Sequence, residues 1–196
     1  MKKFSIYPTE LSEETLNDSK LSGEIKVYNE LKKNNLPGFS VFYSCWWYYE
    51  SSKEKKDPKD GETDFIIAHP NLGILFIEVK GGLIRHDGVN YFSVNKNNVE
   101  YKITNPYMQV RKSKYYTMEL LKKYYTKNLK KELPFININH AVIFPDSSNS
   151  KSFLKADSNE ITLFAEDLPE LFTKLLSILK PKDISNSYGF LGEEGI

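Results

Sequence analysis

The chain has 196 residues, 40% of them hydrophobic, which suffices for one domain with a substantial core but not for two of ordinary size. Its 27 basic and 26 acidic residues give a formal charge of +1, so only a local patch could attract nucleic acid or a membrane surface. The single cysteine, Cys45, excludes an internal disulfide and a cysteine-rich zinc site.

The amino end does not have the composition of a signal peptide, because two lysines are followed by Pro8 and acidic residues instead of an apolar segment. No stretch approaches the roughly 20 apolar residues needed to cross a bilayer. Cys45 lies in an aromatic run and is expected to be a small buried thiol. We therefore expect a soluble, cytoplasmic protein with no membrane partner.

Residues 1–20 show little periodicity and are expected to form an irregular lead-in. A helix is predicted from Leu21 to about Asn34. Glu24 falls within its apolar arc, where an unpaired buried carboxylate would cost several kcal/mol. Either the first turn of the helix stabilises this anion through the helix dipole, or Glu24 faces a cation.

Three strands are predicted next. Residues 39–49 form a dense aromatic run whose rings should pack in the core or the sheet. Residues 50–60 are charged, contain a proline and predict a surface loop. The apolar runs Phe65–Ile67 and Ile74–Val79 predict two further strands, joined by a turn that contains His69-Pro70-Asn71.

Charged residues accompany these last two strands. Alternation along an extended strand places Glu78 and Lys80 on one face, and strand pairing could bring Asp64 beside Glu78. Two close carboxylates repel each other, and a divalent cation between them relieves both the repulsion and the cost of burial. Such oxygen ligands suit magnesium, manganese or calcium. The plainer alternative is a pair of surface charges at the strand ends of an ordinary hairpin.

An antiparallel appendage is predicted after Gly82, with strands at 83–85, 91–94 and 99–103 separated by turn residues. A helix should then run from Asn105 to about Tyr125, with Gln109 in its buried arc. A buried amide needs hydrogen-bond partners, which either an active-site edge or the backbone could supply.

The helix and the residues that follow it are strongly basic. Between Arg111 and Lys131, eight basic residues are opposed by one acid, Glu119. A solvated helix face would look similar, but four interleaved tyrosines suit the phosphates and bases of nucleic acid. The residues predicted to bind nucleic acid are Arg111, Lys112, Lys114, Lys122 and Lys123.

The remaining elements complete a mixed domain. Residues 136–144 predict a buried strand, 161–164 a short strand and 167–179 a helix with a leucine-rich packing stripe. Residues 181–196 have no packing pattern and would be a tail or the start of a linker.

Four segments carry a resemblance to a known family: Gly23-Glu24, Glu62-Thr63-Asp64, Gly73–Lys80 and Asn105–Gln109. Together they resemble the NERD (nuclease-related) domain of the PD-(D/E)xK, or restriction-endonuclease-like, superfamily. The resemblance spans roughly residues 21–179. Thr63 precedes Asp64, so the Pro-Asp pair that gives the superfamily its name is absent, a departure that the superfamily tolerates.

The resemblance implies an α/β, restriction-endonuclease-like core. It would contain a four-stranded mixed sheet flanked by helices, with a β-hairpin insertion after the third core strand. The nuclease-like domain would cover residues 21–180, between the lead-in and the tail.

The resemblance also implies hydrolysis of phosphodiester bonds with Mg²⁺ or Mn²⁺. Asp64 and Glu78 would bind the metal, with the Val79 carbonyl as a candidate third ligand and Glu24 as an accessory ligand. Lys80 would orient or help deprotonate the attacking water. Gln109 would hold the water or the substrate phosphate.

Phosphodiester hydrolysis itself favours carboxylates that hold a divalent cation, because cleavage builds negative charge that divalent cations stabilise. A nearby metal should also lower the pKa of Lys80 toward neutrality. The three histidines, His69, His86 and His140, show no ligand spacing, which disfavours a histidine-metal nuclease.

The leading hypothesis is a Mg²⁺- or Mn²⁺-dependent deoxyribonuclease, with DNA repair or defence against phage as its context. The runner-up is a nucleic-acid-binding or docking module that does little catalysis alone and acts beside a helicase, ATPase or kinase-like domain. An RNase on the same scaffold is the third possibility.

Overall fold

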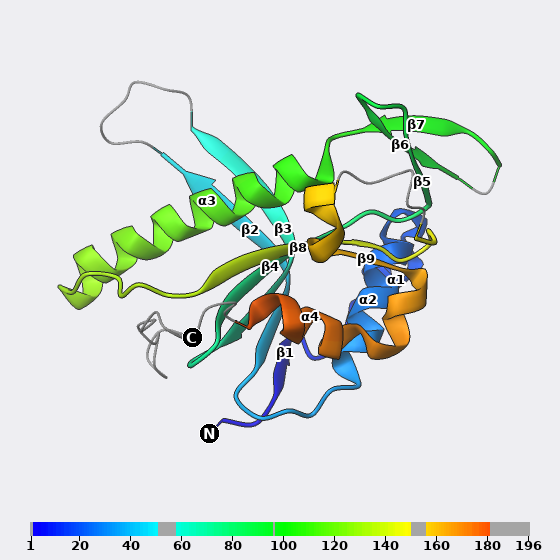
Figure 1. Ribbon diagram of the computed structural model, residues 1–196. Coiled ribbons are helices and arrows are strands. Elements are labelled where there is room, and N and C mark those ends of the chain that lie inside the picture. The colour runs from blue at the N-terminus through cyan, green and yellow to red at the C-terminus, as the bar shows by residue number, and fades with distance from the viewer. Residues whose placement is uncertain (1, 51–57, 96, 150–155, 181–196) are drawn as a thin grey trace.

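The structure is a computed structural model that describes residues 2–50, 58–95, 97–149 and 156–180. Within these residues the centre is a six-stranded mixed sheet of order β1-β2-β3-β4-β8-β9 (Figure 1). Its strands are β1 (Ser5–Tyr7), β2 (Ser40–Tyr49), β3 (Lys59–His69), β4 (Gly73–Val79), β8 (Ile138–Phe144) and β9 (Thr162–Phe164). The α-helices are α1 (Glu13–Asn17), α2 (Ser22–Lys32), α3 (Pro106–Tyr124) and α4 (Leu171–Leu179). Shorter 3-10 or π segments span Ser19–Leu21, Tyr125–Leu129, Ala156–Ile161 and Ala165–Glu170.

The expected α/β core, with a mixed sheet flanked by helices, is confirmed. The four central strands are those predicted: β2, β3 and β4 pair antiparallel, and β8 joins β4 in parallel. The sheet is wider than four strands, because β1 adds a parallel edge beside β2 and β9 another beside β8.

The first twenty residues are more regular than the lead-in that the sequence predicts. β1 pairs with β2 and buries Ile6, and α1 is capped by Ser12, whose Oγ accepts a hydrogen bond from the Thr15 amide at 3.1 Å. A three-residue strand and a five-residue helix are too short for hydrophobic periodicity to show them. The predicted tail, residues 181–196, lies outside the described residues.

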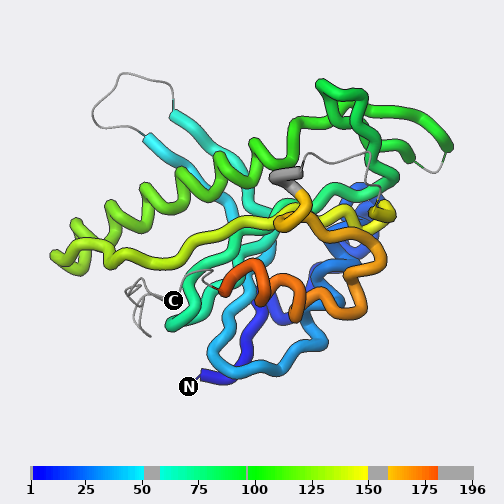
Figure 2. Tube along the Cα trace, in the orientation of Figure 1, coloured from blue at the N-terminus to red at the C-terminus, as the bar shows by residue number. Residues whose placement is uncertain are grey.

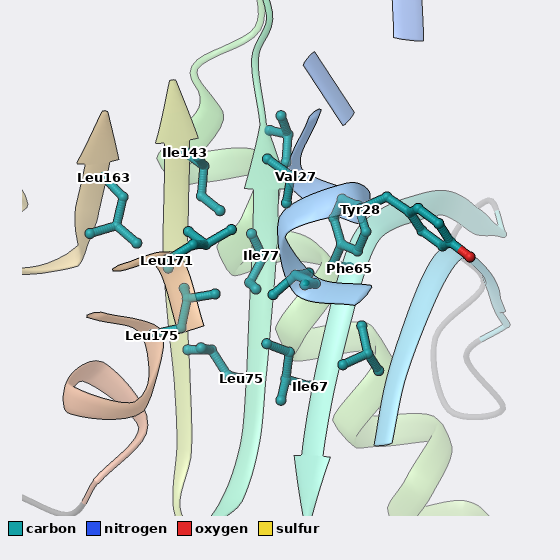
Figure 3. Close-up of a cluster of buried hydrophobic side chains, with 14 of the residues drawn as sticks. Val27, Tyr28, Phe65, Ile67, Leu75, Ile77, Ile143, Leu163, Leu171 and Leu175 are labelled. Atoms are coloured by element: carbon teal, nitrogen blue, oxygen red, sulfur yellow. The ribbon is translucent and has the colours of Figure 1, made fainter. Parts of the chain in front are cut away.

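Helices cover both faces of the sheet (Figures 1 and 2). Figure 3 shows one face, where Val27 of α2 and Leu171 and Leu175 of α4 meet Phe65 and Ile77. On the other face, α3 contributes its buried residues to a cluster with residues of β4 and β8. This second cluster contains Tyr107, Val110, Phe76, Val142 and Phe144.

The sheet forks between β3 and β4. The β3–β4 ladder ends at the pair Phe65↔Ile77, whereas β3 stays paired with β2 as far as Lys59. The free part of the β2–β3 ribbon extends away from β4, beyond the rest of the sheet (Figure 1). Asp64 is the first residue of β3 past the fork.

The extended ribbon explains why the aromatic run of β2 is not uniformly buried. Trp47 packs against α3, with its ring centroid 4.9 Å from that of Tyr116. Its neighbours in sequence, Trp46 and Tyr48, are 73% and 57% exposed because successive side chains of a strand point to opposite faces. The expectation that most of these rings would be buried therefore holds on one face of the ribbon only.

The appendage after β4 is a separate three-stranded antiparallel sheet of β5 (Leu83–His86), β6 (Tyr91–Val94) and β7 (Glu100–Ile103). The three strands predicted after Gly82 are therefore present, and two consecutive antiparallel pairings join them. Among the described residues, no helix is both long enough and apolar enough to pass through a membrane.

Candidate active site

Asp64 occupies the fork between β3 and β4. Its Oδ2 accepts a hydrogen bond of 2.7 Å from the backbone amide of Val79, so its carboxylate takes the place of the backbone partner that a continued ladder would supply. Continuing the register from Phe65↔Ile77 puts Asp64 opposite Glu78. Asp64 is only 8% exposed.

Glu78 is fully buried near the carboxyl end of β4. Its Oε1 lies 2.5 Å from the Nζ of Lys80, whose side chain is 23% exposed. Lys80 donates a hydrogen bond to this carboxylate, and within the described part of the chain no other donor reaches either of its oxygens. A buried carboxylate in that condition is costly, which is typical of a functional site.

Glu24 reaches the same place from the first turn of α2. A Cβ on Gly23 would lie 2.9 Å from the Cα of Gly81, so the absence of a side chain lets α2 approach the segment after β4 closely. The hydroxyl of Tyr43 donates a hydrogen bond to the Glu24 carboxylate. Glu24 is therefore both a first-turn acid and a neighbour of the β3–β4 fork.

Burial and neighbouring charges raise the pKa of all three carboxylates. Burial, followed by the charge of Asp64, raises the pKa of Glu24 to about 7, although the hydrogen bond from Tyr43 opposes the rise. Burial and then the charge of Asp64 raise the pKa of Glu78, and burial raises that of Asp64. A divalent cation would relieve both costs.

Lys80 is the cation of this cluster. Burial lowers its pKa, but the negative charges of Glu78 and Asp64 outweigh that effect and leave the pKa above its ordinary value. Lys80 is therefore an ammonium ion here, and it cannot act as a base until those charges are neutralised.

The chemistry of the donor set suits a hard divalent cation, because Glu24, Asp64 and Glu78 offer only oxygen atoms. No cluster of three or more histidine, cysteine, aspartate or glutamate side chains within the described ranges is already arranged closely enough to hold an ion.

The other two predicted site residues, Val79 and Gln109, contribute no side chain to this cluster of acids. Val79 contributes its amide to Asp64 and sits at the fork itself. Gln109 is half-buried near the start of α3, and among the described residues its side chain makes no hydrogen bond to Asp64, Glu78 or Lys80. The structure places it on the covering helix without joining it to the acids.

Glu62 is a fourth acid that sequence reasoning did not select. Its charge raises the pKa of both Glu24 and Asp64, and its carboxylate accepts a hydrogen bond from the hydroxyl of Ser44. The signal was present, because residues two apart on a strand share a face and Glu62 precedes Asp64 by two.

Each of three predicted nucleic-acid-binding lysines has a partner within the protein. Lys112 lies 5.3 Å from the centroid of the Trp47 ring, and Lys123 lies 4.0 Å from that of Tyr49. Lys122 forms a 2.8 Å ion pair with Glu119. These contacts fasten α3 to the ribbon or neutralise its charge locally.

The other two residues predicted to bind nucleic acid are Lys114 and Arg111. The Nζ of Lys114 lies 3.1 Å from Nδ1 of His140 in β8, and Arg111 is exposed one helical turn earlier. His140 carries no signal in the sequence that would link it to the basic helix.

A comparison with protein families matches residues 19–145 to the NERD, nuclease-related domain, family. The matched segment contains the fork, both of its strands, and the helices that carry Glu24 and Gln109. The chain belongs to the NERD family. NERD domains are placed in the PD-(D/E)xK, restriction-endonuclease-like superfamily, with which the mixed α/β sheet agrees. Comparisons with curated proteins and with solved structures gave no match.

Proposed function

We propose that this NERD domain is a metal-dependent nuclease that hydrolyses phosphodiester bonds, with DNA as its main substrate. The observation that supports the proposal is the convergence of Glu24, Asp64, Glu78 and Lys80 from three separate segments at the fork of the sheet. Buried acids with raised pKa values beside a lysine are unusual outside functional sites.

Asp64 and Glu78 would hold Mg²⁺ or Mn²⁺, with the Val79 carbonyl and Glu24 as further ligands. When bound, the cation supplies positive charge against the negative charge that develops on the phosphoryl and leaving oxygens. A bound cation would neutralise the charges of Glu78 and Asp64, which keep the pKa of Lys80 high. Burial would then dominate and lower the pKa of Lys80. Lys80 would then orient the attacking water or take its proton, and Gln109 would hold the water or the phosphate.

The basic face of α3 would bind the nucleic-acid strand. It carries Arg111 and Lys114 above the sheet, on the helix that follows the inserted strands. We place this activity in the cytoplasm, in DNA repair or in defence against phage, beside a helicase, ATPase or kinase-like partner domain.

Cleavage of plasmid and linear DNA with Mg²⁺ or Mn²⁺ tests the proposal. Asp64→Asn and Lys80→Ala should each lower the rate by about 100-fold or more, since a single preorganised charge at the reacting group contributes roughly that much. Asp167→Asn is the matched control, because Asp167 accepts a hydrogen bond from the Phe164 amide, far along the chain from the fork. Equal activity in the wild type and both site variants would refute the nuclease.

The second candidate, a nucleic-acid-binding or docking module with little activity of its own, is favoured by one observation. The 2.5 Å ion pair between Lys80 and Glu78 engages two of the residues that catalysis would need. This function predicts that DNA binding survives Glu78→Gln and that no divalent metal elicits cleavage.

A further inference from the structure

Lys114 and His140 make an uncommon contact between two nitrogen groups. The Nζ of Lys114 lies 3.1 Å from Nδ1 of His140. An ammonium group can only donate, so Nδ1 accepts this hydrogen bond and the imidazole proton is assigned to Nε2. His140 is then a neutral ring that orients the lysine side chain.

The neutral partner leaves the charge of Lys114 uncancelled. Burial, then Lys114 and Arg111, lower the pKa of His140 to about 4, so the ring stays neutral at pH 7. Burial and then the charge of Arg111 also lower the pKa of Lys114. Within the described ranges, no carboxylate forms an ion pair with Arg111 or Lys114.

The polar atoms that Arg111 and Lys114 themselves present are donors. Lys114 keeps further N–H bonds after the one given to His140, and the guanidinium of Arg111 has five and no acceptor. Phosphate oxygens are acceptors with negative charge, and they match such a donor set in both respects. Among the other lysines of this helix, Lys122 is opposed by the carboxylate of Glu119. Lys112 and Lys123 instead lie against the ribbon of β2 and β3, at the rings of Trp47 and Tyr49.

The Lys114–His140 pair lies within a few nucleotides' length of the acids. His140 is paired with Phe76 across the β4–β8 ladder, and Glu78 is two residues further along β4 on the same face of the sheet. Two residues along a strand and one strand across correspond to about 8 Å between backbones. A nucleic-acid strand that rises about 3.4 Å per nucleotide covers that span in two or three nucleotides.

We propose that Arg111, Lys114 and His140 form a phosphate subsite of this nuclease, in which the neutral imidazole holds Lys114 without cancelling its charge. The subsite rests on the proposed function, because it would bind a backbone phosphate of the substrate near the scissile bond. Arg111 and Lys114 contact the phosphate, and His140 is a positioning residue.

Oligonucleotide binding without divalent metal tests the subsite apart from catalysis. Arg111→Ala combined with Lys114→Ala should weaken binding of a labelled DNA oligonucleotide about tenfold or more, and should reduce the slope of log K against log salt by about two. Lys32→Ala combined with Lys174→Ala removes the same charge from α2 and α4, on the face of the sheet opposite α3, and should change the affinity by less than about threefold. Equal losses in the two double variants would overturn the subsite.

The role of His140 is tested by two variants of equal shape. His140→Asn keeps a neutral acceptor near Lys114 and should retain the affinity and the salt slope, whereas His140→Asp cancels the lysine charge and should reduce the slope by about one. A purely structural role would affect both variants alike, which would contradict the positioning role.

Inorganic phosphate separates failure of the subsite from failure of the proposed function. The ring signals of His140 in the wild type should shift on titration with phosphate, and those of the Arg111→Ala, Lys114→Ala variant should not. If phosphate shifts the ring signals of His140 but no oligonucleotide binds, the phosphate subsite is supported and nucleic acid is refuted as the substrate. If phosphate shifts neither protein, the subsite itself is refuted.

Discussion

At the scale of single residues, the fork between β3 and β4 concentrates negative charge in a buried place. Glu78 is completely buried, Asp64 nearly so, and Glu24 adds a third carboxylate whose pKa rises to about 7. Lys80 provides one positive charge against them. Small changes in hydrogen bonding should therefore alter the protonation of the acids measurably.

Tyr43→Phe should raise the pKa of Glu24 above its value of about 7. The Tyr43 hydroxyl donates to the Glu24 carboxylate and favours its charged form, so its removal leaves burial and the charge of Asp64 less opposed. Titration of the carboxyl carbons by NMR measures the shift. Tyr101→Phe changes an exposed tyrosine of β7 in the same way and should leave Glu24 unaffected. An unchanged Glu24 titration in Tyr43→Phe would contradict the hydrogen bond.

At the scale of the elements, the site depends on how closely the start of α2 approaches the end of β4. Asp146, which follows β8, accepts a hydrogen bond from the Gly82 amide at 2.8 Å and forms an ion pair with Lys26 of α2. This residue thus links the helix that carries Glu24 to the turn after Lys80. Gly23 lies at the point of closest approach.

Gly23→Ala should destabilise the fold despite the better helix propensity of alanine. The new Cβ would lie 2.9 Å from Gly81 Cα and 3.2 Å from the Cγ of Pro145, so α2 must move away from the sheet. We expect a loss of about 1–3 kcal/mol in the free energy of unfolding, measured with urea. Asn29→Ala, at an exposed position of the same helix, should be neutral or slightly stabilising. A Gly23→Ala protein as stable as the wild type would show that the contact is loose.

The ribbon of β2 and β3 is held against α3 by one face of its aromatic residues. Trp47 is 6% exposed, stacks on Tyr116 and donates its indole N–H to Ser113 Oγ at 3.3 Å. Trp46 points to the opposite face. Substituting each of the two neighbouring tryptophans therefore compares a buried ring with an exposed one on the same strand.

Trp47→Ala should cost about 3 kcal/mol or more of unfolding free energy, because it leaves a cavity between the ribbon and α3. Trp46→Ala should cost less than about 0.5 kcal/mol, because the side chain it removes is mostly in solvent. Urea denaturation of both variants makes the comparison. Similar losses would mean that the packing of the ribbon on α3 does not stabilise the fold.

At the scale of the whole molecule, the buried acids should make the metal-free protein less stable as pH rises. The pKa of Glu24 is about 7 in the folded state and 4.5 as its ordinary value. Below about 4.5 Glu24 is protonated in both states and contributes nothing, and above about 7 the folded state must hold a buried anion. The free energy of unfolding should therefore fall across this interval, by about 2 kcal/mol for Glu24 after allowance for its partial exposure.

The matched variant for this prediction is Glu24→Gln, which is neutral at every pH. Its free energy of unfolding between pH 4.5 and 7 should fall less steeply than that of the wild type, with both measured by urea denaturation in a chelator. Parallel curves would show that Glu24 titrates normally in the folded state.

The sequence by itself determined the central strands, the longer helices and the three acids that meet at the fork. These follow from local rules, since alternation along a strand places Glu78 with Lys80 and a first-turn position explains how Glu24 can be tolerated. The family resemblance drawn from the same segments is confirmed by the family match.

Only the tertiary structure decided which long-range neighbours each residue has. The hydroxyl of Tyr43 reaches Glu24, His140 of β8 holds Lys114 of α3, and Trp46 is exposed while Trp47 is buried, because packing between distant segments fixes these relations. The β1 strand and α1 also went unpredicted, since so few residues carry too little periodicity, and β1 is placed by its pairing with β2. Local patterns fix which face of an element a side chain occupies, whereas only the packing of distant elements decides what that face meets.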